Sequence, residues 1–299
     1  MKIAVTGATG LVGRQLIAAL VADGRAVRAL ARRPAAFPPT VTFAPWDTLQ
    51  GPPPETALQD LDAIVHLAGE PVAQRWTPEV KQRIRASRVD GTRRLVESLS
   101  TISARPSVLV SASAIGYYGD RGDKTLTEDA KPGAGFLPET CVEWERTADL
   151  AESLGIRVVK LRIGVVLDPR GGALEKMLPP FRAGVGGRLG SGRQWMSWIH
   201  RQDLIRLIRF AIDTPTLRGP VNATAPHPET NAAFSATLGR ALHRPAILPA
   251  PALAVKLMFG EMAEVVLASQ RVLPQVATAA GFTFQFPTLA PALADLFPG

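Results

Sequence analysis

The sequence predicts an α/β fold, in which a doubly wound parallel sheet carries helices on both faces and is followed by a small C-terminal domain. Three observations support this prediction. The short apolar run Ile3–Val5 passes through a glycine turn into an apolar-periodic helix. Further apolar runs of strand length alternate with amphipathic segments of helix length as far as Ala223. Beyond Pro245 the chain changes character and is proline-rich up to Pro251, which indicates a linker.

The predicted elements follow in order from the apolar pattern. Apolar runs of strand length cover residues 26–31, 41–44, 63–69, 107–111, 156–161 and 220–223. Segments with a helical period cover residues 11–22, 78–100, 204–212 and 230–242. We also expect a helical turn over 177–181, a strand-like run over 281–286 and a last helix over 290–297. In the helix over 78–100, small residues in the apolar stripe, such as Ser87 and Gly91, permit close packing on the sheet.

The composition is that of a folded globular protein. Apolar residues make up 46% and charged residues 20% of the 299 positions, as in ordinary soluble domains. The single cysteine, Cys141, excludes an intrachain disulfide and favours a reducing compartment. No stretch approaches the roughly 18 uninterrupted apolar residues of a membrane-spanning helix, and the N-terminus lacks the pattern of a signal peptide. We therefore expect a cytoplasmic protein with no membrane partner.

The strongly basic balance needs a separate explanation. A net charge of +8 could favour nucleic acid as a partner. Most of the cations are arginines, and they are dispersed along the chain. The densest cluster, residues 81–94, falls on a predicted helix and has the pattern of a solvated face. We expect no nucleic-acid partner, but a basic cleft that suits an anionic small molecule.

The first glycines form the motif around which the chain is organised. Gly7 allows a tight turn, Gly10 allows the backbone to approach a pyrophosphate, and Gly13 allows the helix to pack close to the strand. The helix N-terminus then offers unpaired N–H groups to phosphates. Strand, spacing and helix agree, so the segment predicts a nucleotide site formed by Gly7, Thr9, Gly10, Leu11, Val12 and Gly13.

Two arginines follow the second predicted strand. Residues 24–46 contain no acid, although an NAD-preferring fold usually places Asp or Glu there to bind the ribose 2′-hydroxyl. Arg32 and Arg33 stand in its place and suit the 2′-phosphate of NADP. If each contact contributes about 1.5 kcal/mol, the pair favours NADPH over NADH by roughly 100-fold. The alternative is a pair of surface arginines before the turn at Pro34.

Several motifs resemble those of the extended short-chain dehydrogenases/reductases. They are the opening segment 6–13, the strand 63–69 with its His-Leu-Ala-Gly end, the helix segment 89–97 and the segment 111–119 with its Gly-Tyr-Tyr-Gly end. The resemblance implies a Rossmann-like fold with NAD or NADP along the carboxyl ends of the sheet. It places Asp47 near the adenine, where a turn role is an alternative. It also implies that the cofactor contacts include Leu67, Ala68, Gly69, Glu70, Arg75, Ser111 and Gly164, of which Glu70 and Arg75 are alternatively substrate contacts.

The catalytic side departs from this family's pattern. The resemblance implies that Ser113 orients a substrate hydroxyl or carbonyl. Catalytic members also carry a Tyr-x-x-x-Lys pair, in which the lysine lowers the tyrosine pKa. Here those two positions fall on Cys141 and Glu145. Because a carboxylate raises the pKa of a nearby thiol, we expect Cys141 to be a structural helix residue. The candidate proton donors are Tyr117, Tyr118 and Glu70.

The segment 190–204 is similar to the one that lines the substrate pocket of sugar-nucleotide epimerases. By that similarity, Trp195, Met196 and Ser197 belong to the substrate pocket. We expect structural roles for His66, for His200 and for Asp203, with Asp203 capping the helix over 204–212. No cluster of cysteines and histidines has metal-ligand spacing, so we expect no metal site.

Nearly the whole chain resembles an atypical "epimerase family" branch of the extended short-chain reductases, which has a small C-terminal domain of unknown role. We expect residues 1–225 to bind NADP(H), with 168–200 contributing to the substrate side, and residues 226–299 to form a small substrate or lid domain. The implied activity is that of an NADP(H)-dependent oxidoreductase or epimerase, acting on a small carbonyl or hydroxyl compound or a sugar-nucleotide-like substrate. The alternative is a redox sensor that binds NADP(H) without turnover. Homo-oligomerisation is left open.

Overall fold

The computed structural model describes residues 1–298, and its centre is a seven-stranded parallel sheet. The strand order is β11-β7-β5-β4-β1-β2-β3. The strands are β1 (Lys2–Thr6), β2 (Ala26–Ala31), β3 (Val41–Pro45), β4 (Ala63–His66), β5 (Val108–Ala114), β7 (Arg157–Ile163) and β11 (Gly219–Ala223). The sheet confirms the predicted fold class. Since the strand order reverses between β1 and β4, their carboxyl ends form the crevice where such sheets bind ligands.

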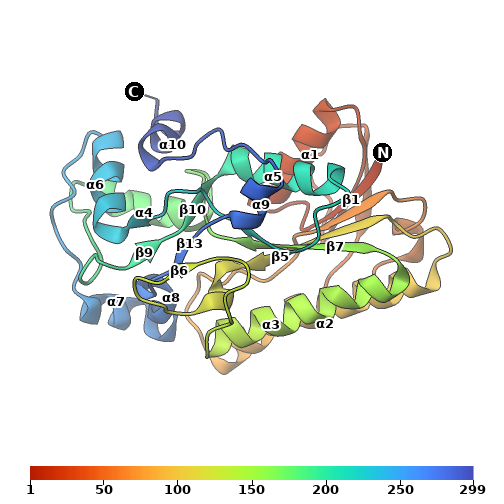
Figure 1. The fold of residues 1–299 in the computed structure, drawn as a ribbon, viewed down its shortest axis with the longest axis horizontal. Helices are drawn as coiled ribbons and strands as arrows, with labels where there is room; N and C mark the ends of the chain where they lie inside the picture. The colour runs from red at the N-terminus through yellow and green to blue at the C-terminus, as the bar shows by residue number, and fades with distance from the viewer. Residues whose placement is uncertain (299) are drawn as a thin grey trace.

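Helices cover both faces of the sheet (Figure 1). Helices α1 (Leu11–Ala22) and α5 (Arg201–Asp213) pack on one face through residues such as Leu16 and Ile208. Helices α2 (Pro78–Thr101) and α3 (Phe136–Asp149) pack on the other face, with Leu95 and Leu99 among the buried residues. The inner strands β1, β4, β5 and β7 are therefore buried on both sides, which explains why they are mostly apolar runs without alternation.

Local sequence explains where α2 begins and how close it lies to the sheet. Pro78 opens the helix, and the Thr77 hydroxyl accepts a hydrogen bond from the Val80 N–H. A Cβ added at Gly91 would lie 2.7 Å from the Cβ of Thr48. The predicted small residue at Gly91 is therefore required by the close approach of the loop after β3.

The C-terminal third of the chain packs into the rest of the molecule. Its helices are α6 (Asn231–Ala241), α7 (Ala252–Phe259), α8 (Ala263–Leu267), α9 (Gln275–Ala279) and α10 (Leu289–Leu296). Leu293 of α10 shares a core with Phe234 of α6 and with Leu174 of α4 (Gly172–Arg182), while Ala277 of α9 joins the core on the sheet.

Short elements complete the C-terminal side. Three strand pairs join β6 (Thr125–Leu126) to β13 (Arg271–Val272), β8 (Val165–Leu167) to β10 (Trp198–His200), and β9 (Trp195–Met196) to β12 (Glu229–Thr230). Four 3₁₀ turns are η1 (Glu55–Ala57), η2 (Ile115–Tyr118), η3 (Leu150–Leu154) and η4 (Gly260–Met262). Among residues 1–298, no helix has the length and apolarity needed to cross a membrane.

Two local predictions were wrong. The helix expected over 204–212 begins at Arg201, and its cap is His200, whose ring accepts a hydrogen bond from the Gln202 N–H. Asp203 lies in the first turn instead, where its carboxylate accepts from the Gln285 and Phe286 N–H groups. The run 281–286 is irregular rather than strand-like, because its aromatic side chains anchor it. The ring centroids of Phe286 and His200 lie 3.9 Å apart, and Phe282 packs on Phe210.

Candidate functional site

The glycine turn has the geometry that its sequence predicts. Gly7 has a φ of +63°, and a Cβ there would lie 2.8 Å from the Leu67 carbonyl group. A Cβ at Gly13 would lie 2.3 Å from the Gly7 oxygen, so only glycine allows α1 to start this close to β1. Helix α1 has no side-chain cap and no acid in its first turn. Its first N–H groups therefore remain available to an anion.

A cavity of about 320 Å³ lies beside this turn, at the carboxyl ends of β1, β2 and β4. Nine of the predicted cofactor residues line it, namely Gly7, Thr9, Gly10, Arg32, Asp47, Leu67, Ala68, Gly69 and Glu70. Its other wall includes Leu30, Trp46, Leu49 and Ser87. The structure thus brings together residues from five segments that are up to 80 positions apart, which is the arrangement expected of a nucleotide site at a switch point.

The end of β4 is held against the glycine turn by Thr6. Its hydroxyl accepts hydrogen bonds from the Leu67 and Ala68 N–H groups, at 3.1 and 3.2 Å. His66 bonds to the hydroxyls of Thr6 and Thr92 through its two ring nitrogens. Burial lowers the pKa of His66 to about 4, so the ring is neutral at pH 7. The prediction of a satisfied histidine inside the sheet is confirmed.

The two arginines after β2 differ in position. Arg32 lines the cavity, and Arg33 is exposed beside it. Neither guanidinium forms an ion pair or a side-chain hydrogen bond with another residue of 1–298. Asp47 also lines the cavity, and its carboxylate accepts from the Leu49 N–H in a local turn. Asp47 therefore has the turn role considered for it, and it also lies on the wall of the cavity.

The remaining predicted cofactor residues lie outside the cavity wall. Leu11 and Val12 open α1, and the Leu11 side chain contacts the loop at Gly171. Arg75 is exposed, and its Nε lies 4.0 Å from the Cβ position of Gly260 in the C-terminal segment. The Ser111 hydroxyl is buried and donates to the Ala112 carbonyl. Gly164 packs against the Ser197 carbonyl, where a Cβ would meet it at 2.7 Å.

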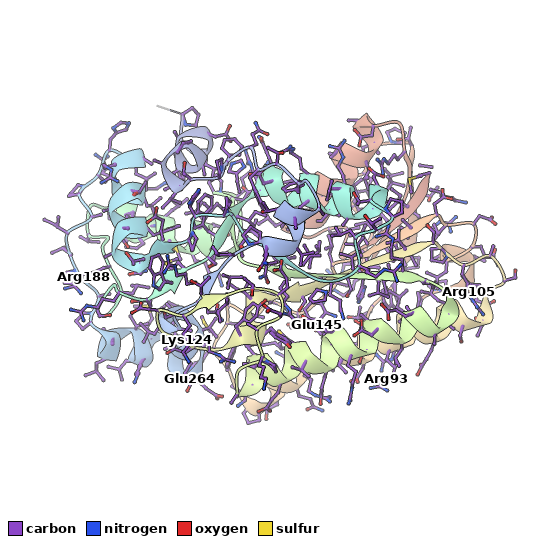
Figure 2. All side chains as sticks on the ribbon, viewed as in Figure 1. Arg93, Arg105, Lys124, Glu145, Arg188 and Glu264 are labelled. Carbon is purple, nitrogen blue, oxygen red and sulfur yellow. The ribbon has the colours of Figure 1, made fainter. Side chains whose placement is uncertain are left out.

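Ser113 lies in a buried network that the sequence analysis did not foresee. Its hydroxyl donates to Glu145 Oε1 at 2.7 Å. The same carboxylate accepts two hydrogen bonds from Arg162, each 2.8 Å long. Arg162 and Glu145 are only 3% and 8% exposed through their side chains, and Glu145 lies between α3 and the sheet (Figure 2). The position where the sequence resemblance implies a lysine in catalytic members thus carries a buried acid, which is paired with an arginine on β7.

The two tyrosines occupy different environments beside this network. The Tyr118 hydroxyl is fully buried, donates to Asn222 Oδ1 at 2.7 Å and accepts from Arg162. Burial raises the pKa of Tyr118 to about 12. Tyr117 is half-buried, and the Arg162 guanidinium lies 3.5 Å from its ring centroid. Of the two, only Tyr117 keeps its hydroxyl free of partners among residues 1–298.

Burial and the charge of Glu145 shift the pKa values of Arg162 and Cys141. Burial lowers the pKa of Arg162, but the hydrogen bonds and the negative charge of Glu145 raise it above its ordinary value overall. Burial, and then the charge of Glu145, raise the pKa of the Cys141 thiol to about 12. The thiol is therefore protonated at neutral pH, as expected of a structural residue.

Residues of the C-terminal segment form further hydrogen bonds with the groups around Tyr118. The Asn222 amide group donates to the Leu273 carbonyl, and Glu128 Oε1 accepts from the N–H groups of Asn222 and Val276. Gln270 donates to two carbonyls of the Ile115–Gly119 turn that carries the tyrosines. Asn222, Glu128 and Gln270 were missed as members of this network by reasoning from the sequence.

The three predicted substrate residues have unequal roles. The Ser197 hydroxyl is buried, donates to the Gln270 carbonyl and accepts from the Val272 N–H, so it anchors β13 rather than facing a pocket. Trp195 is half-buried, with its indole N–H on Asp123 and the Arg271 guanidinium 4.5 Å above its ring. The Met196 sulfur lies 3.2 Å from the Asn231 amide nitrogen. Within the described part of the chain, no group of acids, histidines and cysteine is arranged to hold a metal.

The fold and the site together define a class. A doubly wound parallel sheet, with an uncapped helix N-terminus after a glycine turn at its switch point, is the Rossmann-like nucleotide-binding arrangement. The profile of the NAD dependent epimerase/dehydratase family matches residues 3–223, and that of a domain of unknown function, DUF1731, matches residues 250–296. The chain therefore belongs to the NAD-dependent epimerase/dehydratase family, which confirms the resemblance seen in the sequence.

Relatives match along almost the full chain. The epimerase family protein Mb2239 of Mycobacterium bovis is 44% identical, over 97% of this chain and 96% of its own. The chloroplastic SDR39U1 homolog of Arabidopsis thaliana is 42% identical, over 98% of this chain and 86% of its own. Among solved structures, human epimerase family protein SDR39U1 with NADPH is similar with a TM-score of 0.89 and 33% identity, over 99% of both chains.

Proposed function

We propose that this protein is an NADP(H)-dependent oxidoreductase or epimerase that acts on a small carbonyl or hydroxyl compound or a sugar-nucleotide-like substrate. The cavity of about 320 Å³ between the glycine turn and Arg32 carries the proposal. Membership of an NAD-dependent family and the NADPH bound to the human relative support it.

The residues of the cavity fit a dinucleotide with a 2′-phosphate. The open N–H groups at the start of α1 would bind the pyrophosphate, because no side chain caps them. Arg32 and Arg33 would bind the 2′-phosphate, since both guanidiniums are exposed and unpaired within residues 1–298. The adenine side would be formed by Asp47 and Leu49. When bound, NADP(H) supplies or accepts a hydride.

The hydroxyl proton of Ser113 restricts what the substrate can be. Because Ser113 donates to the Glu145 carboxylate, its oxygen can only accept a hydrogen bond from any further group. A substrate hydroxyl or N–H satisfies that oxygen, whereas a carbonyl does not. We therefore assign to Ser113 the binding of the alcohol form of the substrate.

Tyr117 is the best-placed proton donor and acceptor. Tyr118 is occupied by Asn222 and Arg162, and its raised pKa of about 12 disfavours phenolate. Tyr117 lies on the same turn, and the cation of Arg162 stacks on its ring. That cation would stabilise a transient phenolate, which is the task that the family's lysine performs elsewhere.

A turnover screen tests this function. The protein is mixed with NADP⁺ and a panel of secondary alcohols and nucleotide sugars, and NADPH formation is followed by absorbance. We expect Tyr117→Phe to lower the turnover rate with any substrate found in this panel by a factor of about 10² to 10⁴. The dissociation constant of NADPH should be unchanged. Wild-type rates in Tyr117→Phe would overturn the assignment of Tyr117.

A second candidate is an NADP(H)-binding redox sensor without turnover. It is favoured by the replacement of the Tyr-x-x-x-Lys pair by Cys141 and Glu145, whose carboxylate is held by Arg162. It predicts tight binding, no oxidation of bound NADPH by any carbonyl in a broad panel, and different thermal stabilities of the NADPH and NADP⁺ complexes. Turnover of any substrate at a rate that Tyr117→Phe abolishes would exclude it.

A further inference from the structure

Two segments far apart in the sequence lie side by side at one end of the molecule. Residues 182–193 are the last residue of α4 and the loop after it, and residues 240–258 are the end of α6, the connection to α7 and most of α7. Backbone hydrogen bonds join them: Ala250 N–H to the Arg188 carbonyl at 2.9 Å, and Gly190 N–H to the Ala250 carbonyl at 2.8 Å. We call these residues the 182/240 surface. It lies at the left of Figure 1, opposite the N-terminus, and Figure 2 labels Arg188 on that side.

The 182/240 surface is basic and contains no acid. Neither segment includes an aspartate or a glutamate. No cation of the surface forms an ion pair with another residue of 1–298. The six cations are all exposed: Arg182, Arg188, Arg193, Arg240, Arg244 and Lys256. A local excess of exposed cations of this kind favours a positive potential.

The same surface exposes large apolar side chains. Of the α7 residues, only Val255 is buried, and Leu257 is 73% exposed. Six of the eleven exposed large apolar residues of the protein belong to these two segments, and they are Val185, Ile247, Leu248, Leu253, Leu257 and Met258. An apolar patch of this kind on a globular protein marks an interaction site.

The charge decides which partner fits. A second copy of this chain would place six cations opposite six cations, so the surface is a poor dimer interface. Nucleic acid would pair with the cations and leave the apolar side chains in water. An anionic phospholipid surface satisfies both, because its headgroups attract arginine and lysine while the boundary of its acyl chains takes leucine and methionine.

We propose that the 182/240 surface docks the protein on the face of an anionic phospholipid membrane. The exposed face of α7 enters the headgroup boundary, and the surrounding cations contact the headgroups. Since no helix in residues 1–298 can cross a membrane, the attachment is peripheral and reversible. The proposed site differs from the sequence-based expectation of no membrane partner, and it is independent of the proposed enzymatic function.

Vesicle co-sedimentation of the full chain tests the proposal. We expect vesicles of phosphatidylcholine with about 30 mol% phosphatidylserine to bind the protein at least tenfold more strongly than phosphatidylcholine alone, and salt to weaken that binding. Leu253→Glu with Leu257→Glu should abolish binding, and Arg188→Glu with Arg244→Glu should reduce it at least tenfold. All four residues are exposed, so these variants should keep the wild-type melting temperature.

Matched changes elsewhere provide the control. Arg93 on α2 and Leu150 in η3 are also exposed but lie outside the 182/240 surface. Arg93→Glu with Leu150→Glu should bind vesicles like the wild type. Any of three results would overturn the proposal. They are failure of the folded wild type to bind anionic vesicles, equal binding to both lipid compositions, and an equal loss of vesicle binding in the control variant. Light scattering that shows a dimer dissociated by Leu257→Glu would also overturn it, in favour of self-association.

Discussion

Arg162 on β7 and Glu145 on α3 form a two-point ion pair in the protein interior, with Nε–Oε1 and Nη2–Oε2 distances of 2.8 Å. The pair includes Glu145, which the sequence resemblance places at the lysine position of the Tyr-x-x-x-Lys motif. It fixes the hydroxyl of Ser113 and holds a cation over Tyr117. Two proposals therefore follow from this ion pair. They are the binding of the alcohol form of the substrate by Ser113 and the role of Tyr117 as proton donor and acceptor.

Removing the charge of Glu145 should be strongly destabilising. Glu145→Gln leaves a buried guanidinium without its counter-ion, which costs about 3 to 5 kcal/mol. Urea unfolding monitored by circular dichroism measures the loss. Glu143→Gln is the matched control, because Glu143 lies on the same helix in a partly exposed ion pair with Arg85 and should cost less than about 1 kcal/mol. Equal midpoints for the two variants would show that the buried pair is not structural.

The glycine turn should tolerate no side chain at Gly13. A Cβ there would lie 2.3 Å from the Gly7 oxygen, so Gly13→Ala must displace α1 from β1. We expect loss of NADPH binding together with a lower melting temperature. Gly51→Ala is the control, since nothing lies within 4 Å of its Cβ position and its stability should change by at most about 0.5 kcal/mol. A Gly13→Ala protein that binds NADPH normally would contradict the tight turn.

Cys141 should not react with thiol reagents in the folded protein. It is buried, and burial together with Glu145 raises its pKa to about 12. Because it is the only cysteine, reaction with a disulfide reagent reports on this residue alone. We expect negligible labelling at pH 8 without denaturant and one equivalent in urea. Rapid labelling of the native protein would make Cys141 an accessible nucleophile instead.

His66 should make the protein less stable in weak acid. Its pKa is about 4 when folded and 6.5 when unfolded, so the unfolded chain binds the proton more readily between these values. The stabilisation is complete above pH 6.5 and is lost as the pH falls toward 4, by about 3 kcal/mol in total. Unfolding free energies measured across this window should show the slope. His66→Gln should remove this part of the slope, and exposed His227→Gln should leave it unchanged.

Local patterns were sufficient to predict the sheet and the cofactor side. Gly7, Gly10 and Gly13 act through backbone geometry within one turn, and the inner strands are mostly apolar because both of their faces are covered. The cap of α6 is local too, since Thr230 accepts from the Ala233 N–H three residues on. Such features depend on neighbours in the sequence, which is why the pattern reveals them.

The polar network could not be predicted because its members meet only in the folded chain. Asn222 contacts Tyr118 across 104 positions, and Ser197 contacts Val272 across 75. One signal was available, because Arg162 lies in the buried strand 157–163. A charged side chain buried in a sheet requires a partner of opposite charge. Glu145 was the candidate partner, because the resemblance places this acid where the Tyr-x-x-x-Lys motif has its lysine.

The central claim is that the cavity beside the glycine turn binds NADPH through Arg32 and Arg33. Calorimetric titration of NADPH and NADH tests it most directly, in the wild type and in Arg32→Ala with Arg33→Ala. We predict that the wild type prefers NADPH by roughly 100-fold and that the preference collapses in the double variant. Equal affinity for the two cofactors would contradict the role of the arginines, and binding of neither would contradict the cofactor site itself.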